Sequence, residues 1–431
     1  MKKNIFLSLL LLPASLLAAD SWSLDSCISY AITHSISVCQ NILERQNAEY
    51  SVTEAKDRFL PEVNASVGQS FNFGRGLTSE NTYAQRNTSN FQWGVSMNMP
   101  LFQGLSAIRQ VKQSKLNLQA VLYQVEEAKD NVTLNVISSY LQVLYNKEML
   151  ATAKRQVELS EYELERQRTL AEAGKIAEVD VLQADAQLAQ DRQSRVEAEN
   201  NVAQSLLDLA QLIQLPSAEN FDIDPLNDEV TPLPSVEQVC SNALFSYSSI
   251  LRQKKNIEAA KANEDVARSG YIPRLSLNAG IGSSYYKLSG TANPSFSRQM
   301  RDNLNKYIGF TLSIPVFDGF STRNNLRKAK LQTTLATLQL EDARTSLVKS
   351  INQAHLQAQS ALSKYEAAKV SEDANKISFE AMQEKYNMGR SNPYEFEQAK
   401  NSYLRSTISR IQAQYEYQLR HRILNFYNGT K

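Results

Sequence analysis

The sequence predicts a mainly α-helical protein that carries a small membrane β-sheet and is built from two copies of one unit. Three observations support this fold class. The chain contains an internal repeat, its short apolar segments alternate with period two, and two segments, 105–173 and 320–388, contain no proline or glycine. Because average helices in globular proteins have about 11–12 residues, segments of this length indicate long coiled-coil helices.

The first 19 residues form a predicted secretory signal peptide. Lys2 and Lys3 precede an apolar run, and the small residues Ala18 and Ala19 precede Asp20. A basic start, a short apolar stretch and small residues before a cleavage site are typical of export signals. A membrane anchor helix is the alternative, but the run is shorter than the ~20 apolar residues that a spanning helix needs. We therefore expect an exported chain that begins near Asp20.

The composition argues against an enzyme, a nucleic-acid-binding protein and a disulfide-rich domain. The 431 residues include 46 basic and 45 acidic ones, which leaves no basic surplus for a nucleic-acid partner. Cys27, Cys39 and Cys240 are too few for a disulfide framework in a chain of this length. The three histidines are scattered, and the sequence contains no metal-ligand spacing, phosphate loop or nucleophile motif. We expect no catalytic residue, no metal and no cofactor.

The internal repeat divides the exported chain into two similar halves. MPLFQG at 99–104 returns as IPVFDG at 314–319, and FLPEVNASVG at 59–68 returns as YIPRLSLNAG at 271–280. Such self-similarity indicates a duplicated structural unit. The expected boundaries are a first repeat over 20–215, a proline-containing linker over 216–235 and a second repeat over 236–428.

Each repeat contains two segments that are expected to form the strands of a hairpin. In FQWGVSMNMP, large apolar residues alternate with small or polar ones, so one face of this strand is apolar. Alternation with aromatic residues near the strand ends is typical of lipid-facing strands. A half-buried sheet of a soluble protein shows the same alternation and is the alternative. The expected strands are 62–73, 91–100, 274–286 and 306–315.

Four strands cannot close a barrel by themselves. In lipid the hydrogen bonds of every strand must be satisfied, and small barrels need about eight strands or more. Several chains would therefore have to share one barrel, and three chains would supply twelve strands.

The two long segments carry apolar residues at seven-residue spacing. Val111, Leu118, Val125 and Val132 follow this spacing, and a step of four leads to Val136, where a second series begins. Seven-residue spacing indicates coiled-coil packing, and a step of four locally unwinds the supercoil. Charged and glutamine-rich residues are expected to fill the remaining, solvated faces.

Turns are expected at both ends of each long helix. Gly174 and Gly389 follow the two long segments, at a place where a left-handed glycine commonly ends a helix. Return helices are expected over 178–212 and 393–427. The expected strand-to-helix turns contain Pro100, Gly104, Pro315 and Gly319.

Taken together, these motifs resemble the TolC family of outer membrane efflux proteins. The resemblance is carried by the duplicated P-φ-F-x-G motif after an alternating strand and by the glycine turn at the far end of the long segment that follows it, and it covers about Ser23 to Asn428. It implies a homotrimer with a twelve-stranded β-barrel in the outer membrane of a Gram-negative bacterium and a periplasmic α-barrel of long helices. It also implies a passive, porin-like exit channel for multidrug efflux or type I secretion. The implied partners are a periplasmic adaptor (membrane fusion protein) and an inner-membrane RND, ABC or MFS pump.

The same resemblance implies a gate at the periplasmic tip. By position from the turn glycines, Tyr386 matches the family's gating tyrosine and Asp180 matches the aspartate that it bonds. Glu395 matches one position of the family's acidic ring, and Arg390 lies one residue before the place of its tip arginine. The residues themselves allow another role, because NPYE at 392–395 has the pattern of a helix cap and Asp180 suits a helix start. Gating and capping are both kept as hypotheses.

A second interpretation of the whole chain is a periplasmic coiled-coil scaffold with a soluble β cap. The apolar strand face distinguishes the two, since a soluble cap should tolerate a charge at Trp93 or Phe310 and a lipid-facing barrel should not. The sequence of helices and pore walls does not specify a cargo, so export of drugs, metals or proteins is equally compatible with it.

Overall fold

The computed structural model describes residues 21–77, 81–226 and 232–429. The predicted signal peptide, 1–19, lies outside these residues. The elements are β1 (Ser21–Trp22), α1 (Leu24–His34), α2 (Ile36–Asp57), β2 (Glu62–Asn72), β3 (Arg75–Leu77), β4 (Tyr83–Gln85), β5 (Thr88–Gln103), α3 (Ser106–Glu172), α4 (Glu178–Leu212), β6 (Asp222–Ile223), α5 (Val236–Ser246), α6 (Ser248–Arg268), η1 (Ser269–Tyr271), β7 (Arg274–Leu288), α7 (Phe296–Asp302), β8 (Asn305–Ser313), α8 (Ser321–Asn387) and α9 (Pro393–Asn428).

The chain forms two compact units, and neither coincides with a sequence repeat. The hairpin unit comprises the described parts of Met1–Asn41, Val125–Ser248 and Arg344–Lys431. The sheet unit comprises the described parts of Ile42–Gln124 and Ser249–Ala343. Each unit therefore takes segments from both repeats, so the repeats are not separate domains in space.

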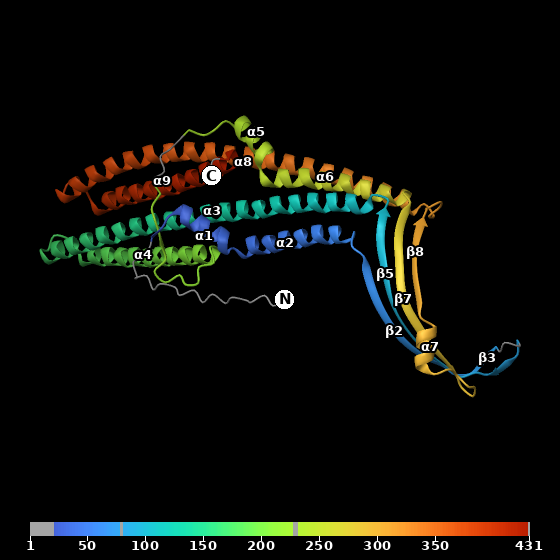
Figure 1. The fold of residues 1–431 in the computed structure, drawn as a ribbon. Helices are drawn as coiled ribbons and strands as arrows, with labels where there is room; N and C mark the ends of the chain where they lie inside the picture. Colours follow the sequence, from blue (N-terminus) through green and yellow to red (C-terminus); the bar gives the residue numbers. More distant parts are fainter. Residues whose placement is uncertain (1–20, 78–80, 227–231, 430–431) are drawn as a thin grey trace. The chain divides into compact units, whose positions relative to one another are not determined.

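The long helices are confirmed. α3 and α8 have 67 residues each and end one residue inside the predicted range on both sides. Along α3, Val136 and Val143 are fully buried and Val157 and Leu164 nearly so, which confirms the seven-residue series. In the hairpin unit α4 packs beside α3 through Leu188, and α9 lies beside α8 (Figure 1). No helix within the described ranges is both long and apolar enough to cross a membrane.

The sheet unit holds a four-stranded antiparallel sheet in the order β2-β5-β7-β8. Its register brings the apolar residues of all four strands onto one face. For example, Val95 lies opposite Ala65 on one side and Ile281 on the other, and Phe310 lies opposite Leu277. The opposite face carries small and polar residues, among which Asn278 donates a hydrogen bond to Thr311 at 3.0 Å.

The two hairpins have the same register, as expected for a duplication. In the first hairpin Ser66 of β2 pairs with Gly94 of β5. The aligned repeat segments relate Ser66 to Asn278 and Gly94 to Gly309, and these two residues are paired in the second hairpin. The repeat seen in the sequence is therefore also a repeat of strand pairing.

The strand-to-helix turns lie at the two predicted glycines, but Pro100 is not part of one. β5 continues through Pro100 to Gln103, and the register shifts between Pro100 and Phe102. A proline cannot donate to a ladder and is tolerated at such a bulge. The second copy differs, since β8 ends at Ser313, before Pro315. β8 is an edge strand within this chain, so no outer neighbour extends it in the described ranges.

Both turns use two successive residues with positive φ. Gly104 has φ +60° and Leu105 φ +67°, and the second copy repeats this with Gly319 at +62° and Phe320 at +64°. A Cβ on Gly104 would also lie 2.8 Å from the Cβ of Ile272. Glycine accepts the left-handed backbone at this position without strain, and the close approach of Ile272 leaves no room for a Cβ.

The predicted linker contains a contact that the sequence did not indicate. β6 pairs in parallel with β1, so the linker and the start of the described chain form a two-stranded ribbon in the hairpin unit. The hydroxyl of Tyr140, which is fully buried on α3, donates to the carbonyls of Trp22 and Asp224 at 3.0 and 2.8 Å. These bonds fasten the ribbon to α3.

Candidate functional site at the hairpin turns

The two helical hairpins of the hairpin unit reverse at the predicted glycines. Gly174 and Gly389 have φ +71° and +70°. After each of them the next residue closes the turn, because the N–H groups of Lys175 and Arg390 donate to carbonyls five residues earlier, both at 2.9 Å. This is the hydrogen-bond pattern of a left-handed helix end. The Arg390 side chain is exposed.

Asp180 and Glu395 both lie in the first turn of a return helix. The carboxylate of Asp180 accepts from the N–H of Ala177 at 3.2 Å. At the start of α9, Asn392 accepts from the N–H of Glu395 at 2.8 Å, and the Glu395 carboxylate accepts from the hydroxyl of Ser391 at 2.7 Å. Acids at these positions satisfy free N–H groups or favour the helix dipole. The Asp180 side chain thus caps α4, whereas the cap of α9 is Asn392 and Glu395 is an acid in its first turn.

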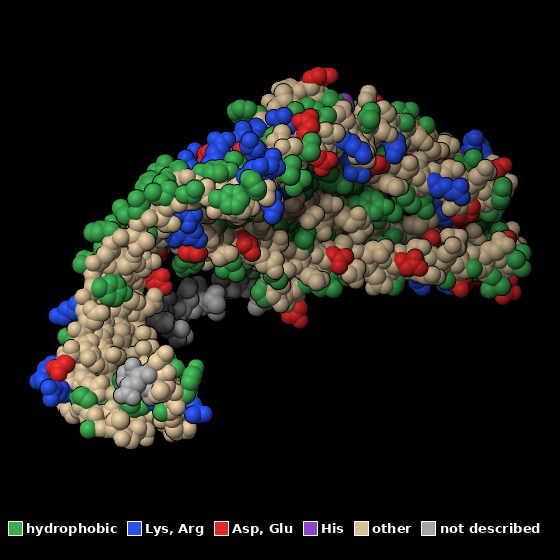
Figure 2. All heavy atoms as spheres, turned by 90° about the vertical axis from the view of Figure 1, so that its right-hand side faces the viewer, with side chains coloured by type: hydrophobic (Ala, Val, Ile, Leu, Met, Phe, Trp, Pro, Cys, Tyr) green, Lys and Arg blue, Asp and Glu red, His purple; other side chains and the backbone are tan. Residues whose placement is uncertain are grey.

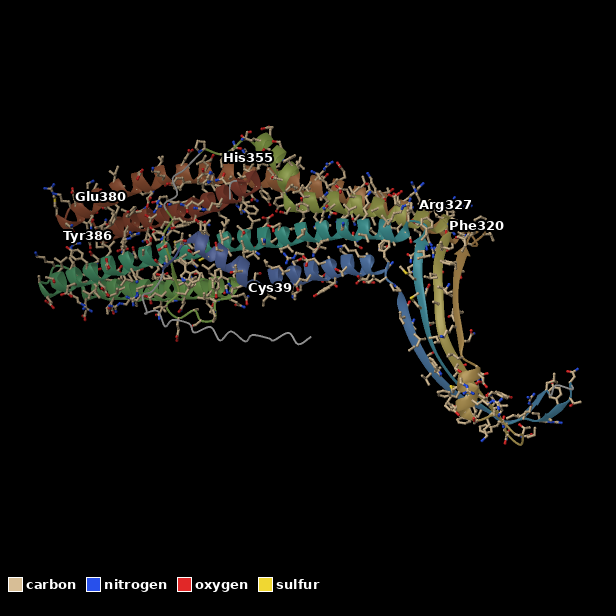
Figure 3. All side chains as sticks on the ribbon, viewed as in Figure 1. Cys39, Phe320, Arg327, His355, Glu380 and Tyr386 are labelled. Atoms are coloured by element: carbon tan, nitrogen blue, oxygen red, sulfur yellow. The ribbon has the colours of Figure 1, made fainter. Side chains whose placement is uncertain are left out.

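The hydroxyl of Tyr386 has a partner on α3 of its own chain. Its hydroxyl donates to Oε1 of Glu163 on α3 at 2.7 Å, and Asp180 lies in the first turn of α4 bonded to its own helix start. Figure 3 places Tyr386 toward the turn end of α8, as it does Glu380. Within the described chain the Tyr386 hydroxyl thus meets Glu163, which lies on the side of α3 that packs against α8. A bond between Tyr386 and Asp180 of a neighbouring coiled coil stays a hypothesis.

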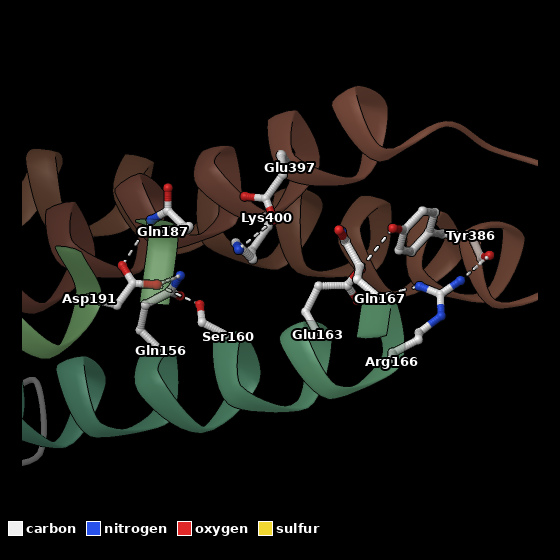
Figure 4. Close-up of polar contacts among 10 residues, drawn as sticks. All are labelled: Gln156, Ser160, Glu163, Arg166, Gln167, Gln187, Asp191, Tyr386, Glu397 and Lys400. Carbon is white, nitrogen blue, oxygen red and sulfur yellow. Dashed lines mark hydrogen bonds and ion pairs between the residues drawn. The ribbon is translucent and has the colours of Figure 1, made fainter. Parts of the chain in front are cut away.

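Several contacts hold Tyr386 in place (Figure 4). The guanidinium of Arg166 lies 3.9 Å from the centre of its ring and donates to its carbonyl at 2.9 Å. The ring also stacks on Phe396 of α9 at 4.6 Å. Gln167 donates to the same carboxylate oxygen of Glu163 at 3.1 Å. We call Tyr386, Glu163, Arg166, Gln167 and Phe396 the tyrosine clasp.

The clasp is buried, and this affects the ionisation of Tyr386. Only 6% of Tyr386 and 5% of Glu163 are exposed. Burial raises the pKa of Tyr386 to about 12, the negative Glu163 acts in the same direction, and Arg166 acts against it. The hydroxyl is therefore protonated, and able to donate, at neutral pH.

A second polar cluster lies farther from the turns in the same unit. The carboxylate of Asp191 on α4 accepts from Ser160 and Gln187, and Lys400 on α9 pairs with Glu397 at 2.7 Å. Asp191 is 7% and Lys400 2% exposed. Buried charges are costly unless they are paired, and here each has a partner of suitable chemistry.

A cleft of about 500 Å³ connects the two clusters. It is lined by residues of α3, α4 and α9, most of them polar, among them Glu163, Asp180 and Lys400. A neighbouring cleft of about 290 Å³ shares Lys400 and contains the Arg410–Glu372 ion pair. The hairpins α3–α4 and α8–α9 thus meet through a polar layer, beside the apolar contact of Leu159 on α3 with Phe379 and Phe396.

Sequence reasoning missed this layer because it assigned polar residues on α3 to a solvated face. Ser160, Glu163 and Gln167 follow one another at spacings of three and four, so they share one face of α3, and all three are buried. This spacing next to the apolar position Leu164 was the available signal. No group of three or more histidine, cysteine or acidic residues with metal-binding geometry occurs in the described ranges.

Comparisons with known proteins give one consistent result. A profile of outer membrane efflux proteins matches residues 27–213 and 239–430. The outer membrane protein TolC of Escherichia coli (strain K12) is 24% identical over 358 residues, which cover 80% of this chain and 70% of that protein. The outer membrane efflux protein BepC of Brucella suis is 22% identical over 373 residues, which cover 85% of this chain and 76% of that protein.

Solved structures show the same fold. The CmeC outer membrane channel of Campylobacter jejuni matches with a TM-score of 0.79 and 18% identity, covering 94% of this chain and 85% of CmeC. The outer membrane protein VceC of Vibrio cholerae matches with a TM-score of 0.75 and 14% identity, covering 94% of this chain and 96% of VceC. At these identities the similarity concerns the fold.

Proposed function

The chain belongs to the outer membrane efflux protein family and is located in the outer membrane of a Gram-negative bacterium, and from this premise we propose that three copies form one passive exit channel. An inner-membrane pump and a periplasmic adaptor supply the substrate and the energy. The relatives are channels and efflux proteins, and the chain conducts substrates without catalysing a reaction.

The sheet is the observation that carries this proposal. Its two outer strands, β2 and β8, each have one edge without a partner strand in the described chain. Its apolar face is exposed as well, with exposed fractions of 73% for Val67, 73% for Ile308 and 69% for Phe310. A face of this kind needs an apolar environment, and free strand edges in lipid must be paired. Closure with two further copies meets both needs.

The duplication gives the register of the joint between copies. Within the chain, Asn98 of β5 pairs with Asn278 of β7. In the aligned repeats Asn98 corresponds to Ser313 and Asn278 corresponds to Ser66. The equivalent pair at the joint is therefore Ser313 of one copy opposite Ser66 of the next. The same step sets Leu312 opposite Val67. Leu312 and Val67 lie on the apolar face, so the proposed joint continues both faces of the sheet without a break.

Disulfide cross-linking tests the joint. Paired residues of antiparallel strands have Cα atoms about 4.5–5.5 Å apart, which lies within the range of a disulfide. Ser66→Cys with Ser313→Cys, in a background without Cys39 and Cys240, should therefore give covalent trimers on denaturing gels after oxidation. The matched control is Ser66→Cys with Gly309→Cys, which shifts the second cysteine four residues along β8. Equal cross-linking in both pairs would argue against the register, and a stable monomer in detergent would reject the shared barrel.

The tyrosine clasp and the polar layer are the proposed periplasmic gate. Tyr386 is carried by α8 and Glu163 by α3, so their bond joins the two helical hairpins. Movement of one hairpin against the other would break it, and docking of the adaptor at the turns would favour that movement. We assign Asp180 to the start of α4 and keep Arg390 as an exposed contact for the tip.

Glu395 is proposed to contribute to an acidic ring in addition to its place at the start of α9. Three copies would bring three such carboxylates together, and negative charge favours cation passage. Glu395→Gln retains a hydrogen-bond acceptor for Ser391 and removes the charge. It should lower cation selectivity in planar bilayers at an unchanged melting temperature, and unchanged selectivity would leave Glu395 with its local place in the first turn of α9 alone.

A further inference from the structure

The short helix α7 lies on the apolar face of the sheet, at the end where the strands meet their long loops. Phe296 packs against Tyr285 at 5.1 Å and against Phe91 at 5.6 Å, and these two are paired neighbours on the apolar face. Ser283 belongs to the same face, is 6% exposed and donates to the carbonyl of Met300 at 2.7 Å. α7 therefore covers the loop end of this face.

Hydrogen bonds attach α7 to the strand that it covers. Gln299 accepts from the N–H of Tyr286 and donates to its carbonyl, both at 3.0 Å. Asn303, which follows α7, donates to the carbonyl of Ser284 at 2.7 Å. These side chains occupy the edge of β7 beyond the start of β8, so α7 is part of the sheet unit and not a free loop.

Basic residues gather around α7. Arg298 and Arg301 lie on α7 with 69% and 79% of their side chains exposed. Lys306 pairs with Ile281 and therefore points to the apolar face, and Lys287 lies on the same face near the end of β7. Asp302 is the acid among them and contacts both arginines at 3.4 and 3.3 Å. Four positive charges and one negative charge leave an excess of +3.

The arrangement of these charges relative to the apolar face indicates the partner. Figure 2 shows hydrophobic side chains along the sheet and Lys and Arg side chains toward its loop-bearing end. An apolar band followed by aromatic rings and then by basic side chains matches the order of acyl chains, interface and headgroups in a lipid leaflet. Arginine in particular forms paired hydrogen bonds with phosphate oxygens.

We propose that Arg298, Arg301, Lys287 and Lys306 form a binding site for phosphate-bearing, anionic lipid headgroups of the leaflet that surrounds the loop end of the sheet. The inference rests on the proposed function, because it requires the apolar face to meet lipid. α7 serves as the support that holds its two arginines at headgroup depth.

The test compares assembled wild-type protein with the double variant Arg298→Gln/Arg301→Gln. Both are purified in a neutral detergent, depleted of lipid, and titrated with phosphatidylglycerol or with phosphatidylcholine, and native mass spectrometry counts the chains and the bound lipids. A basic side chain at an anionic lipid surface contributes about a fivefold change in affinity. The double variant should therefore retain phosphatidylglycerol about 25-fold less well and phosphatidylcholine equally well, with a smaller difference at high salt.

Two controls keep the outcome specific. Lys369→Gln/Lys376→Gln removes two exposed charges from α8 in the hairpin unit and should leave lipid binding unchanged. Excess inorganic phosphate at matched ionic strength should not displace the lipid, and displacement would mean a site for free phosphate. Intact trimers with equal phosphatidylglycerol retention in all variants would overturn the lipid site alone. Absence of trimers in the wild type would overturn the proposed function together with it.

Discussion

Replacing Tyr386 with phenylalanine removes one hydroxyl from the tyrosine clasp and keeps the ring that stacks on Phe396. The lost bond ends on a charged, buried acceptor, and such bonds contribute about 1.5–3 kcal/mol. Glu163 keeps its bond from Gln167 at 3.1 Å and its ion pair with Arg166 at 3.4 Å. No buried charge of the clasp is left without a partner, so the change should weaken the contact between the hairpins without unfolding them.

The expected result is a larger open fraction of the channel. A loss of about 1.5–3 kcal/mol corresponds to a factor of about 10–150 in an equilibrium between two states. Planar bilayer recordings should show Tyr386→Phe in higher conductance states far more often than the wild type. Tyr394→Phe is the matched control, because Tyr394 is 76% exposed and also lies beside the turn. The reasoning is refuted if Tyr386→Phe behaves like the wild type, or if both variants open equally.

The pH dependence of the same bond gives an independent check. Because burial raises the pKa of Tyr386 from 10.0 to about 12, the folded state holds the proton more tightly than the unfolded state does. The resulting stabilisation is fully present below pH 10 and is lost as the pH rises toward 12. The wild type should therefore lose more thermal stability than Tyr386→Phe over this interval, measured by circular dichroism. Parallel losses in the two proteins would contradict a buried donor at this position.

Three further predictions concern the sheet, the turns and the cysteines. Phe310→Arg should reduce trimer yield on native gels, since a charge on a lipid-facing strand costs about 2–4 kcal/mol at mid-depth. Thr311→Arg places the charge on the opposite face and should not reduce the yield. Equal losses in both variants would favour a soluble sheet buried on both faces. Gly104→Ala should lower the melting temperature. A positive φ in a non-glycine residue costs about 1–3 kcal/mol, and the added Cβ would lie 2.8 Å from the Cβ of Ile272. An unchanged melting temperature would show that this turn can relax. Iodoacetamide at pH 8 should label exposed Cys39 and leave Cys27 unlabelled in the folded protein. Cys27 is fully buried, and burial raises the pKa of its thiol to about 12. Alkylation of Cys27 at the same rate as Cys39, measured by mass spectrometry, would exclude this packing.

The sequence by itself determined the long helices, the four strands of the sheet, the return helices and their order. The alternation of apolar and polar residues located the strands. The absence of proline and glycine predicted the bounds of α3 and α8 to within one residue at each end. The turns at Gly174 and Gly389 followed from the left-handed conformation that glycine accepts. These features depend on residues close in sequence, and each of them occurs once in each repeat.

The tertiary structure decided which distant residues meet. The partner of Tyr386 is Glu163, 223 residues away, and local pattern could not select it over Asp180. β1, at the start of the described chain, pairs with β6 of the linker, and the helix α7 covers a face that the strand alternation had left fully exposed. In each case the contact satisfies a buried hydrogen-bonding group or an apolar surface. Whether such a group is buried at all depends on how the helices and strands pack, and that is fixed only when the whole chain has folded.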